Sequence, residues 1–334
     1  MNAENANKRT VLITGGSRGI GEACVRRFSK NGDRVAFFYR SRVEDARRVA
    51  SETGALAISV DVSSSESVER GLSEVRSALG EIDVLVNNAG VSSIGLFTDV
   101  SDDEWARVIG TNLTGAFYVT RGVLPDMIRR HKGRVVQIGS MWGKTGASCE
   151  VAYSAAKAGL RGLTMALAKE VGPSGITVNC IEPGVIATEM NSALSEETIT
   201  ELSNETPLMR LGTPGEVADA VFFLTSESAA FITGQILGVD GGFAVGDYRR
   251  QENRKVSCRF VDNDRIIFPK IFFGRSFYLC KNPHRCKKAK NREKESELPI
   301  LYFVLSLGHS VGKEPHRPQR RPNRQNRDVF FYAE

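Results

Sequence analysis

Three side chains in the middle of the sequence could together protonate an oxygen atom, namely Ser140, Tyr153 and Lys157. Tyr153 and Lys157 are four residues apart in a run rich in Ala and Leu, which predicts a helix with both side chains on one face. A phenol is a weak acid, with an ordinary pKa of about 10, and a nearby ammonium group lowers that value. Ser140 follows an apolar, strand-like run, so its hydroxyl can hydrogen-bond a substrate oxygen. These residues would form a proton donor, a group that adjusts its pKa and an oxygen clamp, a chemistry that needs no metal.

The spacing of Ser, twelve residues, Tyr, three residues and Lys resembles the catalytic signature of the short-chain dehydrogenase/reductases. The motif Tyr-x-x-x-Lys alone is common, and a buried Tyr beside a surface Lys would produce it as well. The resemblance implies that Tyr153 donates a proton to a carbonyl oxygen and that Ser140 positions this oxygen. It also implies that Lys157 lowers the pKa of Tyr153 and holds the nicotinamide ribose of a cofactor.

The elements that must position these residues start near the beginning of the chain. A strand over residues 9–14, a Gly-rich turn and a helix to about residue 31 would open a dinucleotide-binding βαβ unit. The glycines let a pyrophosphate approach the helix N-terminus, where free N–H groups and the helix dipole favour an anion. The spacing matches the Thr-Gly-x-x-x-Gly-x-Gly turn of the short-chain family. The residues of this turn expected to bind the cofactor are Gly15, Ser17, Arg18, Gly19, Ile20 and Gly21.

The end of the second predicted strand, residues 34–39, indicates which dinucleotide is bound. An NAD enzyme would place an Asp or Glu near this point to hold the ribose 2′-hydroxyl. Here the strand is followed by Arg40 and Arg42, and Arg18 in the turn is basic as well. Two guanidinium groups that converge on one spot suit a 2′-phosphate, so the sequence predicts NADP(H). The alternative is that these arginines are simply solvated beside a loop.

Further cofactor contacts are implied by the resemblance at the ends of three later strands. The strand over 55–60 leads to residues that match those at the adenine, and the strand from residue 83 ends in the Asn-Asn-Ala-Gly motif of the family. The strand over 176–181 is followed by Pro-Gly and by residues that match those at the nicotinamide carboxamide. These expected cofactor residues are Asp61, Val62, Asn88, Ala89, Gly90, Ile186 and Thr188, together with Tyr153 and Lys157.

Asn112 lies inside a long predicted helical stretch, residues 102–130, where Asn is unfavourable by propensity. The resemblance supplies a reason, because the matching Asn sits at a helix distortion and holds a water that leads to the active-site Lys. Gly110 and Gly115 on either side fit such an irregularity. The expected catalytic residues are therefore Asn112, Ser140, Tyr153 and Lys157.

Seven strand-like runs alternate with helical stretches over about residues 10–243, which predicts an α/β fold. We expect one Rossmann-type, doubly wound, parallel seven-stranded sheet with helices on both faces, in a domain over residues 1–246. The interrupted helical segment 189–211 would cover the substrate. An irregular or partly disordered basic C-terminal extension is expected over residues 247–334.

The charge is distributed unevenly between these two parts. The 334-residue chain has a net charge of +6, but residues 247–334 contain 21 Lys and Arg against 10 Asp and Glu, whereas residues 1–246 contain 24 against 29. The overall basic balance therefore says nothing about what the domain binds. Basic residues mixed with aromatics in the extension leave nucleic-acid binding open as a remote alternative. Cys280, His284 and Cys286 fit no common zinc spacing, so no metal site is expected.

Other sequence features indicate where the protein functions and how it assembles. The N-terminal residues are polar, so no signal peptide is expected, and no apolar run approaches the roughly 20 residues of a membrane span. The six cysteines show no disulfide spacing, which suits a reducing cytoplasm. The resemblance also implies a homo-oligomer, a dimer or tetramer formed through the helices at 102–130 and 153–171, which carry apolar residues on several faces, and through the last strand.

Within the family, the chain is most similar to the 3-oxoacyl-(acyl-carrier-protein) reductases. Three blocks carry this likeness, namely residues 154–160, 175–179 and 207–216. The expected activity is NADPH-dependent reduction of a carbonyl, with a 3-oxoacyl thioester of a carrier protein or of CoA as substrate. The alternative within the class is a sugar, a polyol or another secondary alcohol. The carrier-binding arginines of that subfamily align with His131 and Ser174, and Arg129 and Arg130 are the basic residues nearby.

Overall fold

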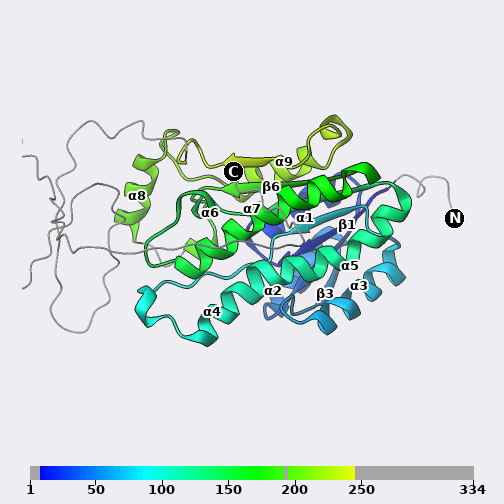
Figure 1. Ribbon diagram of the computed structural model, residues 1–334, viewed down its shortest axis with the longest axis horizontal. Helices are drawn as coiled ribbons and strands as arrows, with labels where there is room; N and C mark the ends of the chain where they lie inside the picture. The colour runs from blue at the N-terminus through cyan, green and yellow to red at the C-terminus, as the bar shows by residue number, and fades with distance from the viewer. Residues whose placement is uncertain (1–7, 192–194, 245–334) are drawn as a thin grey trace, which may run out of the picture. The chain divides into compact units, whose positions relative to one another are not determined.

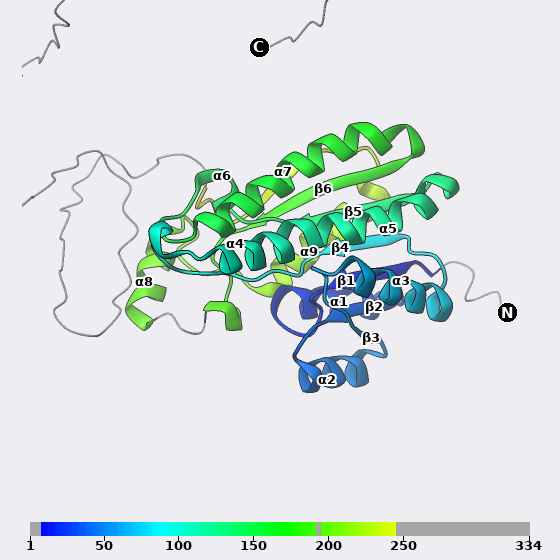
Figure 2. The same cartoon turned by 60° about the horizontal axis from the view of Figure 1, so that its bottom comes forward.

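The computed structural model describes residues 8–191 and 195–244, which form a seven-stranded sheet with helices on both faces (Figure 1). All strands are parallel, and their spatial order is β3-β2-β1-β4-β5-β6-β7 (Figure 2). This arrangement confirms the predicted fold class. The strands are β1 (Thr10–Thr14), β2 (Arg34–Tyr39), β3 (Leu56–Ser59), β4 (Val84–Asn87), β5 (Gly133–Ile138), β6 (Ile176–Pro183) and β7 (Ile236–Val239).

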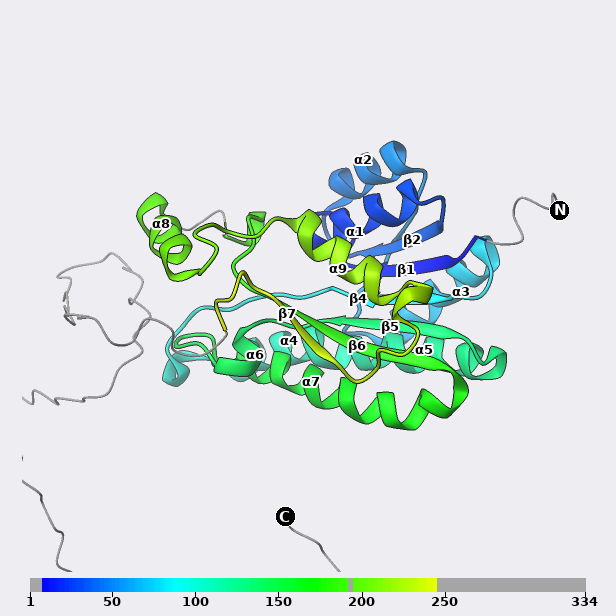
Figure 3. The same cartoon turned by 90° about the horizontal axis from the view of Figure 1, so that it is seen from above.

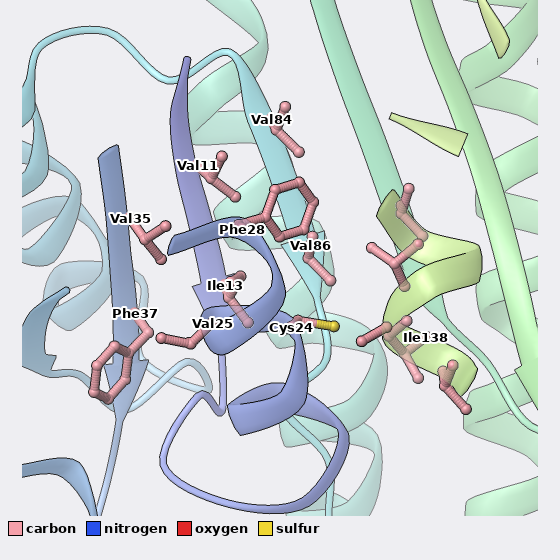
Figure 4. Packing of buried hydrophobic residues seen from close by; sticks show 14 of the residues in the cluster. Val11, Ile13, Cys24, Val25, Phe28, Val35, Phe37, Val84, Val86 and Ile138 are labelled. Atoms are coloured by element: carbon pink, nitrogen blue, oxygen red, sulfur yellow. The ribbon is translucent and has the colours of Figure 1, made fainter. Parts of the chain in front are cut away.

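Two apolar cores lie on the two faces of the sheet. Successive residues of a strand point to opposite faces, so Val11 and Ile13 enter one core and Leu12 enters the other. Figure 4 shows Phe28, from the first helix, among the valines and isoleucine of the central strands. Strands that are buried on both faces read as continuous apolar runs, which explains why the sequence pattern identified them well.

The helices alternate with the strands along the chain. The first core is covered by α1, α2 and α9, and the second by α3, α5 and α7. Figure 3 shows α1, α2 and α9 on one side of the sheet, with α5 and α7 on the other. The helices are α1 (Gly19–Lys30), α2 (Val43–Thr53), α3 (Ser65–Leu79), α4 (Asp102–Ile109), α5 (Gly115–Arg130), α6 (Trp142–Thr145), α7 (Val151–Val171), α8 (Glu196–Glu205) and α9 (Pro214–Leu224).

The stretch predicted as one helix over 102–130 is interrupted by a π-helical turn over Gly110–Thr114, between α4 and α5. Asn112 lies in this turn and is 1% exposed. A π-turn inserts an extra residue into the helical ladder and reorients the side chains around it. The distortion expected at Asn112 is therefore present.

Other elements differ from expectation or refine it. The sequence analysis assigned no helix to α2 or α6, and both are present. Helix α9 starts at a capping box, in which Thr213 and Glu216 satisfy each other's backbone N–H groups. Within the described residues, no helix is both long enough and apolar enough to cross a membrane. The predicted extension over 247–334, with Cys280, His284 and Cys286, lies outside these residues.

Candidate active site

The candidate site lies at the carboxyl edge of the sheet. Because every strand is parallel, all the loops that follow the strands meet at this edge, and the chain changes winding direction between β1 and β4. Ligands of open α/β sheets bind in the crevice at such a switch point. Figures 1 and 2 both show α4, α6 and α8 gathered at this end. Every residue predicted to bind the cofactor follows a strand at this edge or lies on α1 or α7 next to it.

The turn between β1 and α1 is fixed by hydrogen bonds from its neighbours. The amide of Asn88 donates to the carbonyls of Thr14 and Gly15, both at 3.0 Å, and the Thr14 hydroxyl accepts from the backbone N–H of Asn88 and Ala89. A Cβ at Gly21 would come within 2.0 Å of the Gly15 carbonyl oxygen, so only glycine allows α1 to pack this closely against the turn. The helix N-terminus is thus held open toward the crevice.

The basic residues expected at a 2′-phosphate lie beside this turn. Arg18 is the N-terminal cap residue of α1, and Arg40 directly follows β2. The Arg40 guanidinium lies 4.0 Å from the carboxylate of Asp61, a contact that the sequence did not predict. Burial raises the pKa of Asp61, but hydrogen bonds from Ser63 and the charge of Arg40 hold this pKa below its ordinary value. Arg40 is half-exposed and can still turn toward a ligand.

Asn112 is held on the segment that follows β4. Its side-chain oxygen accepts from the Val91 backbone N–H, and its amide nitrogen donates to the Val91 carbonyl, both at 2.8 Å. A Cβ at Gly90 would lie 3.4 Å from the Asn112 side-chain oxygen and 3.6 Å from Nζ of Lys157. The structure therefore brings Asn112, Gly90 and Lys157 together.

Ser140, Tyr153 and Lys157 meet between β5 and α7. The Ser140 side chain hydrogen-bonds the Tyr153 phenol, and its oxygen also accepts from the Trp142 backbone N–H at 3.2 Å. Nζ of Lys157 lies 5.5 Å from the centre of the Tyr153 ring and donates to the Ile138 carbonyl at 2.7 Å. Lys157 is 3% exposed. One helix face and one strand end thus supply a phenol, a hydroxyl and an ammonium group at one place, as the spacing predicted.

The protonation of these groups differs from the expectation. Burial raises the pKa of Tyr153 to about 12, against a smaller lowering by the hydrogen bond to Ser140. Burial also lowers the pKa of Lys157 to about 8. The predicted lowering of the Tyr153 pKa by Lys157 is therefore not what the structure gives, because desolvation outweighs it and the ammonium group is directed at Ile138. Tyr153 stays protonated at neutral pH, which suits a proton donor.

Glu150 is a neighbour of this site that the sequence analysis missed. It precedes the first turn of α7, and its carboxyl group hydrogen-bonds the Ser92 side chain. Burial raises the pKa of Glu150 above its ordinary value, and the carboxylate in turn raises the pKa of Tyr153. The signal was present in the sequence, because an acidic residue three positions before Tyr153 falls on the same helix face.

The remaining predicted residues lie further from the phenol. The segment after β6 carries Ile186 and Thr188, and it is fixed by a bridge between Ile186 and Gly212 and by Asn191, whose amide donates to the Ile186 carbonyl at 2.7 Å.

Arg129, one of the basic residues near the predicted carrier-protein position, pairs with Glu81 and Asp126. These contacts lie at the amino edge of the sheet, away from the site.

Arg130 lies in the same amino-edge cluster as Arg129 and pairs with Glu81 and Asp83. These two arginines, the basic residues near the predicted carrier-protein position, therefore already have carboxylate partners within the chain. In the part of the chain that the structure describes, no group of three His, Cys, Asp or Glu side chains could hold a metal ion.

A family model and curated relatives match this domain. The model described as enoyl-(acyl carrier protein) reductase matches residues 15–244. An acetoacetyl-CoA reductase of Shinella zoogloeoides is 45% identical over 235 residues, which are 70% of this chain and 98% of the relative. A 3-oxoacyl-(acyl-carrier-protein) reductase of Escherichia coli strain K12 is 39% identical over 240 residues, 71% of this chain and 98% of the relative.

Solved structures share the fold. An actinorhodin polyketide ketoreductase variant, crystallised with NADPH, superposes with a TM-score of 0.68 at 36% identity, and the match covers 71% of this chain and 98% of that one. A protein described as a putative gluconate dehydrogenase from Agrobacterium tumefaciens gives a TM-score of 0.67 at 33% identity, covering 71% and 96%. In both cases the match covers nearly all of the solved chain and about the share of this chain that the structure describes.

Proposed function

The chain belongs to the short-chain dehydrogenase/reductase family, and we propose that it reduces the carbonyl of a 3-oxoacyl thioester to a 3-hydroxyacyl group with NADPH. The observation that carries this proposal is the hydrogen bond between Ser140 and a Tyr153 phenol that burial keeps protonated, with Lys157 beside the ring. Relatives named acetoacetyl-CoA reductase and 3-oxoacyl-(acyl-carrier-protein) reductase support the substrate class.

The side chains of this site divide the work of a carbonyl reduction. Ser140 donates a hydrogen bond to the carbonyl oxygen and so fixes it beside the Tyr153 phenol. Tyr153 gives its proton to that oxygen as negative charge develops on it. Bound NADPH supplies the hydride that the carbonyl carbon accepts. Lys157 holds the nicotinamide ribose, and Asn112 keeps the segment at Val91 in place and maintains the proton relay to Lys157.

The cofactor residues form a cradle that fits a dinucleotide phosphate. The β1–α1 turn presents the N-terminus of α1, which favours the pyrophosphate, and Gly90 lies next to Asn112 and Lys157. Arg18 and Arg40 would hold the 2′-phosphate, which selects NADPH over NADH. The other residues proposed to line the cradle are Gly15, Ser17, Gly19, Ile20, Gly21, Asp61, Val62, Asn88, Ala89, Ile186 and Thr188.

Exposed apolar side chains at the same edge suit an acyl chain. Leu96 and Phe97, on the segment after β4, are 60% and 64% exposed, and Leu208, on the segment after α8, is 62% exposed. Backbone hydrogen bonds tie these segments to the site, from Gly95 to Cys149 and from Leu208 to Gly241. An apolar acyl substrate would cover part of this surface, whereas a sugar would leave it in water.

A second candidate is the oxidation or reduction of a sugar acid or polyol. The structural relative described as a gluconate dehydrogenase and the Glu150 carboxyl group beside Tyr153 favour it, since a carboxylate accepts hydrogen bonds from substrate hydroxyls. Nucleic-acid binding through the basic residues 247–334 lies outside the described residues and stays a remote prediction.

Exposed apolar side chains and the cysteines support a proposal on assembly and cellular location. Trp105 on α4, Phe117 on α5 and Met165 on α7 are exposed apolar side chains, which favours a homo-oligomer packed through these helices. The described cysteines are free thiols, which suits a cytoplasmic protein.

The test is a turnover screen of the full chain with NADPH and NADH. The substrates are acetoacetyl-CoA, the same acyl group on a carrier protein, quinones and keto forms of sugar acids. We expect the highest kcat/KM for a 3-oxoacyl thioester with NADPH. Turnover confined to sugar acids, in either direction, would support the second candidate instead, and comparison of the two thioesters decides between CoA and carrier protein.

A further inference from the structure

Behind Lys157 lies an ion pair that the proposed reaction does not use. Glu182 stands near the carboxyl end of β6 and is 4% exposed. Nη1 of Arg161, on α7, donates to both carboxylate oxygens of Glu182 at 2.6 Å. A carboxylate buried this deeply needs a charged partner, and Arg161 supplies it.

The pair touches the strand end that holds Lys157 in place. A Cβ at Gly139 would lie 3.1 Å from Cγ of Glu182. The residue before Gly139 is Ile138, whose carbonyl accepts the hydrogen bond from Lys157, and the residue after it is Ser140. Arg161 follows Lys157 by four residues, one helical turn, on the same face of α7. The ion pair therefore joins α7, β6 and the end of β5 directly behind the catalytic residues.

The Cys180 thiol lies within reach of all these charges. Burial and the Glu182 charge raise the pKa of this thiol to about 12, against a smaller lowering by the charges of Lys157 and Arg161. All three charges thus act on one buried atom. Lys157 also faces Tyr153 across 5.5 Å and lies near Asn112. Two buried cations in the described residues are Arg134, at the start of β5 opposite Thr177, and Lys157, at the end of β5 opposite Ile181. Without Arg161, the ammonium of Lys157 would therefore be the nearer of the two to the Glu182 carboxylate.

We propose that Arg161 and Glu182 are positioning residues for Lys157: Arg161 occupies the Glu182 carboxylate and thereby keeps Lys157 on the Ile138 carbonyl, facing Tyr153. The effect on turnover rests on the proposed function, but the effect on Lys157 itself does not. Two consequences follow from the charges. Removal of Arg161 alone leaves a carboxylate that stabilises the charged ammonium, and removal of Glu182 alone leaves a guanidinium that destabilises it.

The experiment measures the titration of Lys157 in the full chain by NMR of lysine labelled at Cε, in Arg161→Met, Glu182→Met and the double variant. We expect the pKa of Lys157 to rise by about one unit in Arg161→Met and to fall in Glu182→Met. In the double variant this pKa should lie within about half a unit of the wild-type value. We expect kcat to fall about tenfold or more in Arg161→Met and to fall less in Glu182→Met. In the double variant kcat should recover to within about threefold of the wild type. The signal of Lys157 is assigned from its loss in Lys157→Met.

Two controls separate positioning from stability. Arg161→Lys keeps a cation on Glu182 and should leave the titration of Lys157 near its wild-type value, even if the fold loosens. Arg9 and Asp33 form a matched pair at the opposite edge of the sheet, where the side-chain exposures are 21% and 5%, against 26% and 5% for Arg161 and Glu182. Arg9→Met should lower the unfolding temperature without moving the titration of Lys157.

Some outcomes would overturn the proposal. Shifts of the Lys157 pKa in the same direction in the two single variants, or no shift in either, would show that the pair only stabilises the fold. A double variant that is as stable as the wild type yet titrates abnormally would show that Arg161 does not act on Lys157 by occupying the Glu182 carboxylate. If single variants fail to fold, the double variant and Arg161→Lys still decide, because neither leaves a buried charge unpaired. A wild type that reduces no thioester would refute the proposed function and leave the titration result standing.

Discussion

Lys157, at the carboxyl edge of the sheet, is a buried charge of a different kind from the ion pairs at the amino edge. At the amino edge, Arg9 grips the Asp33 carboxylate with two nitrogens, at 3.0 and 2.9 Å, and Arg130 pairs with Asp83 at 2.6 Å. At the carboxyl edge, Lys157 is more deeply buried, at 3% exposed, but its ammonium is held by a neutral carbonyl, and burial lowers its pKa to about 8. The strands β1, β2 and β4 thus begin at satisfied ion pairs, whereas the end of β5 holds a charge from α7 whose burial is only partly compensated.

This difference separates residues that hold the fold from residues that perform chemistry. A paired buried charge contributes to stability only while both partners are present. A buried charge with a neutral partner lowers the stability of the folded state, and it persists where the chemistry requires it. We therefore expect opposite effects: substitutions of Tyr153 and Lys157 should remove activity and spare or raise stability, while substitutions in the ion pairs at the amino edge should do the reverse.

The largest effect is expected for Tyr153→Phe, which removes the proton donor and keeps the ring. General acid catalysis contributes roughly 10²–10⁴-fold, so kcat for acetoacetyl-CoA should fall about 10³-fold. The dissociation constant for NADPH, measured by fluorescence titration, should change little, because the phenol acts mainly in the transition state. A variant that keeps most of its kcat would show that another group supplies the proton, and Glu150 would be the first to test.

The second effect concerns stability and pH. Lys157→Met should abolish activity yet stabilise the protein at pH 7 by up to about 3 kcal/mol, the equivalent of a pKa that is lowered from 10.5 to about 8. Below pH 8 the lysine is charged in both states, so its full burial penalty is present in the wild type. As the pH rises from about 8 to 10.5, the folded state releases the proton first and the penalty disappears.

Urea unfolding at pH 7 and pH 10.5 measures this difference. The advantage of the Met variant over the wild type should shrink at the higher pH. An equal or lower stability of the variant at pH 7 would mean that the hydrogen bond to Ile138 offsets the whole cost of burial, and the contrast between the two edges would not hold.

At the amino edge, Arg9→Met should have the reverse profile. Asp33 would keep only the 3.2 Å hydrogen bond from Asn31, and the Thr225 carbonyl would lose its 2.8 Å bond from Arg9, so the free energy of unfolding should fall by about 2 kcal/mol. The value of kcat should stay within about twofold of the wild type, because the strand ends at the other edge keep their partners. Chemical denaturation and steady-state rates on one preparation test both statements, and a tenfold loss of kcat would break the comparison.

A smaller effect is expected at Arg40, which is exposed and acts on a ligand rather than on the fold. Arg40→Asp should weaken NADPH binding and lower the NADPH/NADH ratio of kcat/KM at least about tenfold, since the 2′-phosphate loses an ion pair and meets a repulsive charge. Arg42→Asp, two residues along, is the matched control and should change this ratio less. An unchanged ratio in Arg40→Asp would place the 2′-phosphate elsewhere.

The sequence predicted the parts of the molecule that depend on local pattern. Strands buried on both faces read as continuous apolar runs, and the turn after β1 was recognised because its glycines meet steric needs, as at Gly21. The spacing of Tyr153 and Lys157 was enough to bring their side chains together on one helix face. The irregular turn at Asn112 was expected from an unfavourable residue between two glycines, and it is a π-turn.

What the sequence could not supply depends on contacts between distant residues. The direction of the Lys157 ammonium depends on the Ile138 carbonyl, 19 positions away, and burial of the Tyr153 phenol raises its pKa where a lowering was expected. The pairing of Arg161 with Glu182 spans 21 positions and leaves no periodic signal. The short helix α6 packs on α7 and follows from tertiary structure rather than from propensity.

The smallest effect is expected when the residues after Val245 are removed, although the described chain ends at the functional edge. Phe243 packs edge-on against Trp142 at 5.8 Å between ring centres, and Lys144 donates to the Ala244 carbonyl at 3.0 Å, so residues 243 and 244 anchor this end of the described chain to α6. A protein that ends at Val245 should therefore fold, stay oligomeric and reduce its substrate at least as fast as the full chain. Light scattering and NADPH oxidation on both proteins measure this.

A second truncation sharpens the result. A protein that ends at Gly242 loses both the Phe243 contact and the Ala244 carbonyl, and should reduce its substrate more slowly, because α6 carries the chain from Ser140 toward Tyr153. Equal activity of the two truncated proteins would mean that these contacts do not support the site. Loss of folding or activity on truncation at Val245 would show that residues beyond it belong to the enzyme, and the carboxyl edge would then be completed by a part of the chain that the family resemblance does not cover.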